Sequence, residues 1–307
     1  MIYLKVRGGL CNRIRTLDSL LILSARYNKD LTVLWPLDSA LNVSYHELFQ
    51  PVENSRVKLE IIDCPPGYPE KYYSGICNMI KNLVKGRILD QRLRSIVKRL
   101  EKLPKGSVLS ESYLDKLYND IIAHSSSTVT LMDNFFIKGI KNQVDNLMQS
   151  DKPVYINSCY RLEELEDNYG KFLPQGEIIE KIIGTTDRFK NTYGLHIRRT
   201  DHTSAKVHSS TEKFISLIED ILQNENDATF FLSTDDPRTK SELIKKYGDR
   251  IIYNDIQSFD RNKSEAAKEA VLDLFCLSKT KKVFGSHHSS FSQVAAQIGN
   301  IPEITVK

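Results

Sequence analysis

The feature that most constrains the fold is a regular alternation of short apolar runs and longer amphipathic segments in the second half of the chain. Strands are predicted at 192–197, 229–233, 250–253 and 281–285, and helices at 211–223, 237–247, 264–279 and 289–299. Alternation at this spacing is typical of a doubly wound parallel sheet. We therefore expect a Rossmann-like α/β domain in this half.

The first half opens with the same kind of unit. A strand, a helix and a strand are predicted at 2–6, 12–27 and 31–35. This order again implies a parallel sheet. Two further strands are predicted at 128–132 and 153–157. With a boundary in the loop-rich stretch near 165–190, we assign 1–175 to an N-terminal α/β domain and 176–307 to the C-terminal Rossmann-like domain.

Composition narrows the class of protein. The 307 residues suit two domains of ordinary size, and a formal net charge of +4 is too small to indicate a nucleic-acid-binding protein. The five cysteines show no CxxC or Cys/His metal-binding spacing, so we expect reduced thiols. No cofactor is expected. The chain opens on a short strand rather than a signal sequence, and no apolar stretch is long enough to cross a bilayer. A cytoplasmic location is therefore expected.

Two arginines, Arg198 and Arg199, follow the first strand of the second half. Adjacent strand residues point to opposite faces, so one arginine is expected to bind a ligand and the other a carboxylate such as Asp201. A guanidinium group matches the oxygens of a phosphate with two parallel hydrogen bonds. A structural ion-pair network is the alternative.

Two more strand ends carry polar side chains. Asp235 and Asp236 follow the next strand. One of them is explained as a helix cap, and the other could orient an arginine, contact a ribose hydroxyl or, least favoured, bind a metal. The segment 284–293 runs from a strand through a Gly/Ser/His loop into the last helix, whose N-terminal N–H groups form an anion site. Helix capping would require only one serine there, and the adjacent pair His287 and His288 lacks a third metal ligand.

A fourth segment, the turn at Gly8 and Gly9, joins the first strand to the first helix. Glycines at such a turn let a ligand approach the backbone. The turn lacks the spacing of the dinucleotide-binding fingerprint and of the NTPase phosphate loop. Taken alone, it is equally well a plain connection.

These motifs together resemble those of the fucosyltransferase superfamily that uses GDP-fucose. The segments are HIRRTD at 196–201, STDDP at 233–237 and SSFSQVAAQIG at 289–299, in that order. The nearest likeness is to core α1,6-fucosyltransferases and bacterial nodulation fucosyltransferases, over 192–300 and 6–20. The resemblance implies a GT-B architecture, in which two Rossmann-like domains with parallel sheets face a cleft. It also implies transfer of fucose with inversion and without a metal.

The resemblance further implies roles for individual residues. Arg198 would hold the β-phosphate and stabilise the leaving GDP, His196 would contact the guanine, and Asp273 would read the guanine edge. Without a metal, guanidinium and helix-terminus donors must stabilise the leaving diphosphate. Asn12 would lie across the cleft near the sugar–phosphate end. The other donor-binding positions are Gly8, Gly9, Arg199, Asp235, Asp236, Ser289, Ser290 and Ser292.

The catalytic base stays open. Core fucosyltransferases carry a glutamate a few residues after RRTD, whereas 202–208 of this chain contains none. His202 or His208 could serve, because a histidine titrates near neutrality. Asp201 would be a poor base if it pairs with an arginine. Some relatives lack an obvious base, so none is strictly required.

The expected partners are a GDP-fucose donor and a glycan or glycolipid acceptor, without nucleic acid. Residues 80–103 are predicted to form a helix with one apolar face and one face rich in Lys and Arg. Such a helix could rest on anionic lipid at the inner membrane face, although a packed helix with a solvated face is favoured. The alternative functions are the same reaction with another GDP-sugar, or binding of a nucleotide sugar without catalysis.

Overall fold

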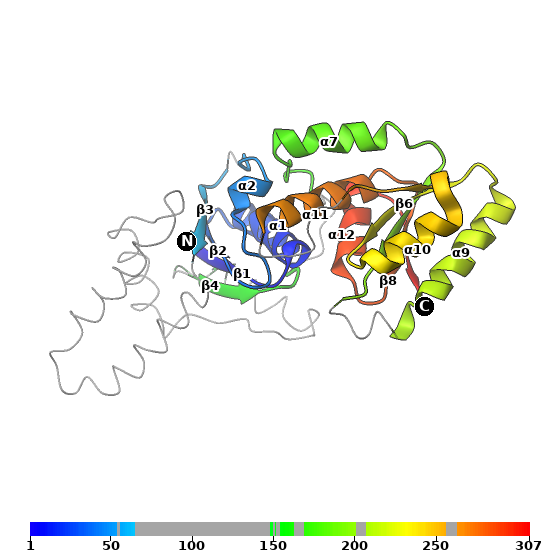
Figure 1. Cartoon of the computed structure of the whole chain (residues 1–307). Coiled ribbons are helices and arrows are strands. Elements are labelled where there is room, and N and C mark those ends of the chain that lie inside the picture. Colours follow the sequence, from blue (N-terminus) through cyan, green and yellow to red (C-terminus); the bar gives the residue numbers. More distant parts are fainter. Residues whose placement is uncertain are drawn as a thin grey trace. The chain divides into compact units, whose positions relative to one another are not determined.

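The computed structural model describes residues 1–53, 56–64, 148–149, 151, 154–162, 169–200, 207–255 and 263–307. The chain divides into two compact units, Met1–His46 with Val52–Leu165 and Glu47–Pro51 with Glu166–Lys307. Each unit contains one parallel β-sheet connected by helices (Figure 1). The α/β fold class predicted from the sequence is confirmed. The strand predicted at 128–132 and the basic helix predicted at 80–103 lie outside the described residues.

The first unit is a four-stranded sheet in the order β3-β2-β1-β4. Its strands, which are all parallel to their neighbours, are β1 (Ile2–Val6), β2 (Leu31–Pro36), β3 (Leu59–Cys64) and β4 (Val154–Ser158). Ile2 pairs with Leu31 on one side and with Val154 on the other. The helix α1 (Leu10–Arg26) connects β1 to β2 and buries an apolar face, which contains Ile14, Leu17, Leu20 and Leu21. The short α2 (Tyr45–Leu48) contains the point at which the chain passes from the first unit to the second.

The second unit is a five-stranded sheet in the order β7-β6-β5-β8-β9. The strands, again all parallel, are β5 (Thr192–Ile197), β6 (Thr229–Thr234), β7 (Ile251–Ile252), β8 (Val283–Ser286) and β9 (Glu303–Val306). The helices are α7 (Gly176–Thr186), α9 (Thr211–Asn224), α10 (Pro237–Tyr247), the 3-10 helix η2 (Gly248–Arg250), α11 (Ser264–Leu277) and α12 (Ser290–Gly299). The core of the sheet and α9 includes Leu195, Ile197, Phe214, Ile218 and Phe230, which are all buried.

The helix α7 corrects one expectation from the sequence. The stretch 165–190 was expected to be rich in loops, but residues 176–186 form α7. Ile178 and Ile182 lie one turn apart and are both buried, as a helix packed on one face requires. Gly184 weakens this pattern in the sequence, because glycine disfavours helix interiors.

The division between the units falls after Leu165, before the boundary drawn at 175. Phe172 and Leu173, which lie between these points, contact the segment Glu47–Pro51 of the second unit. Phe49 and Phe172 lie with their ring centroids 6.1 Å apart, and Gln50 N donates to Leu173 O at 2.8 Å. In the part of the chain that the structure describes, no helix combines the length and apolar character needed to span a bilayer.

Candidate functional site

In the second sheet, the direction in which the chain adds strands reverses between β5 and β8. From β5 the chain builds outward to β6 and β7, and it then returns to the other side of β5 to form β8 and β9. Ligands of open α/β sheets bind outside the carboxyl ends of the strands at such a switch point. Arg198 follows β5 directly, and His287 follows β8 directly. The segments singled out in the sequence therefore meet at the expected place in this unit.

The backbone at Arg198 is fixed by the neighbouring strand. Arg198 N donates to Ser286 Oγ at 3.0 Å, and Ser286 Oγ donates to His196 O at 3.2 Å. Ser286 is the last residue of β8, and only 1% of its surface is exposed. Sequence reasoning did not select this serine, because nothing separates it in the sequence from the other small residues of the loop.

A carboxylate at the end of β6 orients the arginine side chain. Arg198 Nε lies 3.2 Å from Asp235 Oδ2, and the two side chains are 23% and 20% exposed. Asp235 Oδ1 also accepts from Arg199 N at 2.7 Å, and its Oδ2 accepts from Thr200 Oγ1 at 2.7 Å. Of the roles considered for this aspartate, orientation of an arginine is the one that matches the geometry.

Arg199 is turned toward the start of α9. Its Nε and Nη2 donate to Thr211 Oγ1 at 3.3 and 3.2 Å, and its Nη1 donates to Arg198 O at 2.9 Å. Its guanidinium also lies 6.0 Å from the centroid of the Phe214 ring. The sequence predicted that one arginine binds a ligand and the other a carboxylate. In the structure Arg198, the arginine expected to bind the ligand, is the one that pairs with a carboxylate, that of Asp235. Asp201, the partner considered from the sequence, lies outside the described residues.

Asp236 is accounted for by helix capping. Its carboxylate accepts from Thr239 N at 3.1 Å, from Thr239 Oγ1 at 2.7 Å and from Arg238 N at 3.4 Å at the start of α10. Pro237 occupies the first position of that helix, where the missing N–H costs nothing. Asp236 is therefore the capping member of the aspartate pair.

His196, a residue of β5, contacts the first residues of α12. Its Nδ1 lies 3.3 Å from Ser289 Oγ, and its ring stacks on Phe291 with centroids 4.8 Å apart and planes inclined by 20°. Ser289 caps α12 by accepting from Phe291 N at 3.4 Å. Burial, with a smaller contribution from Arg198, lowers the pKa of His196 to about 3. The imidazole is therefore neutral at physiological pH.

The serines of α12 differ in orientation. Ser292 is fully buried, and its Oγ lies 3.2 Å from both Ser289 O and Glu303 Oε1. A Cβ on Gly285 would lie 2.1 Å from Ser292 Oγ, so the helix contacts the β8 backbone directly there. Ser290, at the first helical position, is half-buried. In this structure the Ser292 hydroxyl thus stabilises the helix start and does not face the open edge.

Asp273 lies in α11 and is 2% exposed. Asn254 Nδ2 donates to its Oδ1 at 2.8 Å, and a further hydrogen bond joins it to Ser233 near the end of β6. Burial raises the pKa of Asp273 to about 6, although these hydrogen bonds lower it in part. Sequence reasoning did not select Asn254, which lies just beyond the end of β7 and has no motif around it.

Three histidine rings gather beside the start of α12. The centroids of His208 and His287 are 4.7 Å apart, and those of His287 and His288 are 3.9 Å apart. His287 N donates to Ser209 Oγ at 2.8 Å. His208, one candidate base, thus lies near the switch point, whereas His202 lies outside the described residues. Within the ranges described, no group of three His, Cys, Asp or Glu side chains is arranged to hold a metal ion.

The glycine turn of the first unit is held by a buried arginine. Gly8 has a φ of +76°, and a Cβ at this position would lie 2.8 Å from Asn12 Nδ2. Gly9 is the N-cap of α1. Arg13, which is 0% exposed, donates from Nε to Gly8 O at 2.7 Å and from Nη2 to Asp38 Oδ1 at 2.9 Å. The donor-binding roles of Gly8, Gly9 and Asn12 stay predictions.

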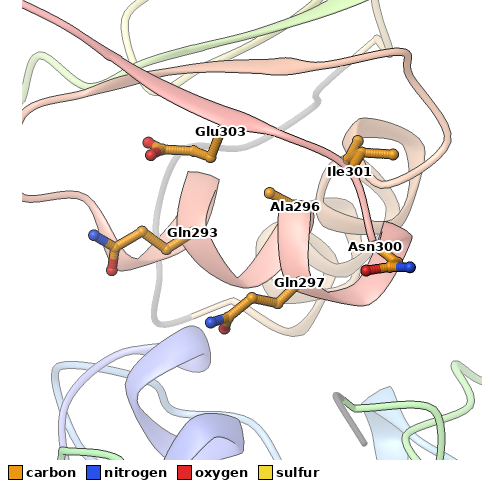
Figure 2. Close-up of a pocket in the computed structure, with 6 residues that line it drawn as sticks. All are labelled: Gln293, Ala296, Gln297, Asn300, Ile301 and Glu303. Carbon is orange, nitrogen blue, oxygen red and sulfur yellow. The ribbon is translucent and has the colours of Figure 1, made fainter. Parts of the chain in front are cut away.

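A cavity of about 330 Å³ lies along α12 and β9 (Figure 2). Its lining consists of Gln293, Ala296, Gln297, Asn300, Ile301 and Glu303, none of which was predicted as a site residue. Glu303 is the first residue of β9, so this part of the cavity lies toward the amino end of the strand. The carboxyl ends of the strands are the better candidate for a nucleotide site.

Several solved structures have an architecture similar to that of this chain. The structure of NodZ α-1,6-fucosyltransferase soaked with GDP-fucose matches 97% of this chain and 92% of its own, with a TM-score of 0.59 and 14% identity. The fucosyltransferase NodZ from Bradyrhizobium matches 96% of this chain and 90% of its own, with a TM-score of 0.58 and 14% identity. The chain has the fold of these enzymes.

A plant fucosyltransferase shares this GT-B fold as well. A mutant of Arabidopsis thaliana FUT1 in complex with GDP matches 99% of this chain and 69% of its own, with a TM-score of 0.54 and 13% identity. A scan against protein-family models and a search of curated protein sequences give no match. The GT-B fold predicted from the motifs is therefore confirmed by structure alone.

Proposed function

We propose that this protein is a glycosyltransferase that binds GDP-fucose and transfers the fucose to a hydroxyl group of a glycan. The observation that carries the proposal is Arg198, oriented by Asp235 beside the start of α12 at the switch point of the second sheet. The proposal is supported by the shared fold with fucosyltransferases whose structures were determined with GDP-fucose or GDP.

The chemistry required is stabilisation of a leaving diphosphate. As the acceptor oxygen attacks the anomeric carbon, the bond from that carbon to the diphosphate oxygen breaks and its electron pair stays on GDP. A guanidinium held at Nε has two terminal amino groups that can bind two phosphate oxygens. The N–H groups at the start of α12 add partial positive charge. We propose that these donors act without a metal and that attack opposite the diphosphate inverts the anomeric centre.

The base and the guanine contact are further parts of the proposal. A histidine of the segment 202–208, His202 or His208, would take the proton of the acceptor hydroxyl. Asp273, when ionised, would accept from the N–H groups of guanine. Its hydrogen bond with Asn254 supports this role, because it fixes the carboxylate in one orientation.

A cytoplasmic reaction is part of the proposal. It is supported by the odd number of cysteines, five, and by the lack of a CxxC spacing, which is usual in proteins of a reducing compartment. A glycan or glycolipid is the proposed acceptor, and contact of residues 80–103 with anionic lipid is the proposed means of reaching a lipid-linked one.

A donor comparison tests the proposal. The full chain is incubated with GDP-fucose, GDP-mannose or UDP-glucose in the presence of EDTA, and the release of GDP or UDP is measured with and without a mixture of glycans. Release from GDP-fucose that increases with glycans supports the proposal. Release from GDP-mannose alone would identify a different GDP-sugar donor.

A second readout separates catalysis from binding. Calorimetric binding of GDP-fucose without any release, across a broad glycan mixture, would favour a protein that binds the nucleotide sugar and does not turn it over. Release that occurs only when Mg²⁺ or Mn²⁺ is restored would contradict the metal-free mechanism.

A further inference from the structure

The carboxyl edge of the first sheet holds an arginine that the proposed function does not use. Arg15 lies in the second turn of α1 and is half-buried. Its Nε donates to Cys159 O at 2.7 Å, and its guanidinium carbon lies 5.1 Å from the centroid of the Tyr160 ring. Cys159 and Tyr160 are the first two residues after β4. The guanidinium is therefore fixed at the carboxyl end of that strand.

This position is the switch point of the first sheet. From β1 the chain builds outward to β2 and β3, whereas β4 lies on the opposite side of β1. Arg7 N, just past the end of β1, donates to Ser158 O at 3.1 Å, so the chain segments leaving β1 and β4 are adjacent. Ligands of parallel sheets bind outside this pair of strand ends. Arg15 thus lies where a ligand of the first unit is expected.

Arg15 differs from two nearby arginines, Arg13 and Arg161, whose charges are each balanced by a carboxylate. Arg13 pairs with Asp38 at 2.9 Å, and Arg161 pairs with Asp18 at 2.5 Å. Among the described residues, no salt bridge includes Arg15, and its partners are a neutral carbonyl and an aromatic face. A half-buried cation held by such contacts keeps two terminal amino groups in a fork that suits a carboxylate or phosphate.

We propose that Arg15, held by Cys159 and Tyr160, binds a carboxylate or phosphate group carried by the sugar acceptor. The assignment to the acceptor rests on the proposed function, in which Arg198 and α12 serve the donor diphosphate at the second sheet. Because those groups serve the diphosphate, and the donor-binding positions predicted near β1 (Gly8, Gly9 and Asn12) carry no charge, we assign the anion at Arg15 to the other ligand, the acceptor. The acceptor class is accordingly an acidic glycan that carries either a uronic acid or a sugar phosphate.

Titration with charged sugars tests the inference. The full chain is titrated with methyl glucuronide, glucose 6-phosphate and methyl glucoside in the presence of saturating GDP, which blocks phosphate binding at the donor site. We expect at least one charged sugar to bind and methyl glucoside not to bind. The two charged probes distinguish a uronic acid from a sugar phosphate.

Three variants locate the binding. Arg15→Gln is expected to weaken binding of the charged sugar about tenfold to a hundredfold, as for loss of a charged hydrogen-bonding partner. Arg15→Lys keeps the charge without the fork and should fall between that variant and the wild type. The control Arg26→Gln changes an exposed arginine in the last turn of the same helix and should bind like the wild type.

Several outcomes would overturn the inference. These are absence of binding by both charged sugars, equal binding of methyl glucoside, and wild-type affinity in the folded Arg15→Gln and Arg15→Lys variants. A fall in GDP affinity in Arg15→Gln would assign the arginine to the donor and would also overturn it. If the wild type binds charged sugars but not GDP, the proposed function fails and the anion site at Arg15 stands.

Discussion

Arg198 is held at its backbone by Ser286 and at its side chain by Asp235, so its position is set by three neighbouring strands. Such a residue is pre-organised for charge stabilisation, because little reorganisation is needed when a diphosphate binds. The ion pair is about one-fifth exposed on each side, so its own contribution to folding stability is small. Its main effect is on geometry.

Replacement of Arg198 tests this account of the leaving group. Arg198→Lys should lower the rate of GDP release from GDP-fucose by a factor of roughly a hundred or more, because a lysine cannot bind two oxygens in a planar fork. Arg250→Lys is the control, since Arg250 donates to Ala228 O just before β6 and directly precedes β7, so it lies at the amino ends of these strands and not at their carboxyl ends. Near-normal release by the Arg198→Lys variant would contradict the assignment.

Because His196 is buried, the folding stability of the protein is expected to depend on pH. Its pKa is about 3 in the folded protein against 6.5 in a model peptide, so between these values the unfolded chain binds a proton that the folded chain does not. The wild type should therefore lose stability as the pH falls below 6.5.

A matched comparison isolates this effect. His196→Gln should destabilise the protein at pH 7.5, and this destabilisation should shrink by about 2 kcal/mol at pH 5, because the variant lacks the titrating ring. Urea unfolding at the two pH values measures the difference. The same cost of the substitution at both pH values would show that His196 is not held neutral.

The proposed guanine contact of Asp273 predicts that nucleotide affinity depends on pH. Its pKa is raised to about 6, and only the carboxylate form accepts two N–H groups of guanine. GDP affinity should therefore be constant above pH 7 and fall by up to about tenfold per unit below pH 6. The Asp273→Asn variant should bind GDP weakly, and its GDP affinity should not show the fall below pH 6 that the Asp273 carboxylate causes. Parallel curves for the two proteins would rule out Asp273 as the titrating guanine contact.

At the residue scale, the sequence predicted where the candidate site residues lie better than it predicted which way their side chains point. The motif pattern selected Arg198, Asp235 and Ser289, which all lie at the switch point of the second sheet. It did not predict that Ser292 faces inward, because that depends on the contact between α12 and Gly285 of β8. Ser286 and Arg13 were missed for the same reason, since their partners are backbone atoms distant in the sequence.

At the element scale, the contact between α12 and β8 sets the position of the proposed anion site. Gly285→Ala would place a Cβ 2.1 Å from Ser292 Oγ and 2.4 Å from Ser292 Cβ, so the helix must shift. We expect a loss of stability of about 1–3 kcal/mol and weaker GDP binding. Urea unfolding and calorimetry measure the two effects.

A second glycine serves as the control. A Cβ at Gly184 in α7 would have no atom within 4 Å, so Gly184→Ala should raise stability by up to about 1 kcal/mol through helix propensity. Its GDP affinity should match that of the wild type. If Gly285→Ala behaves like Gly184→Ala, the close contact between α12 and β8 is not what positions the site.

Strong periodic elements were predicted closely, and short or interrupted ones were missed. Thr192–Ile197 and Pro237–Tyr247 have the predicted bounds, because the apolar pattern is regular and proline starts the helix. β9 (Glu303–Val306) was missed, since four residues with one buried side chain give little periodic signal. Leu59–Cys64 was missed as well, because an edge strand with mostly half-buried residues shows no clear alternation.

At the scale of the whole molecule, the two units repeat one topology. In each sheet the first strand lies inside, two strands extend to one side and the chain then returns to the other. Composition and element order were sufficient to predict this class. The exact division was not predictable, because Glu47–Pro51 belongs to the second unit and only the three-dimensional packing of Phe49 on Phe172 reveals it.

The central claim is that the second unit recognises a guanosine diphosphate without a metal. It is tested most directly by calorimetric titration of the full chain with GDP, GMP, ADP and UDP in the presence of EDTA. The account predicts that GDP binds at least about tenfold more tightly than the other three, and that Arg198→Ala and Asp273→Ala each lose most of this affinity. Equal affinity for all four nucleotides, or no binding of GDP, would contradict it.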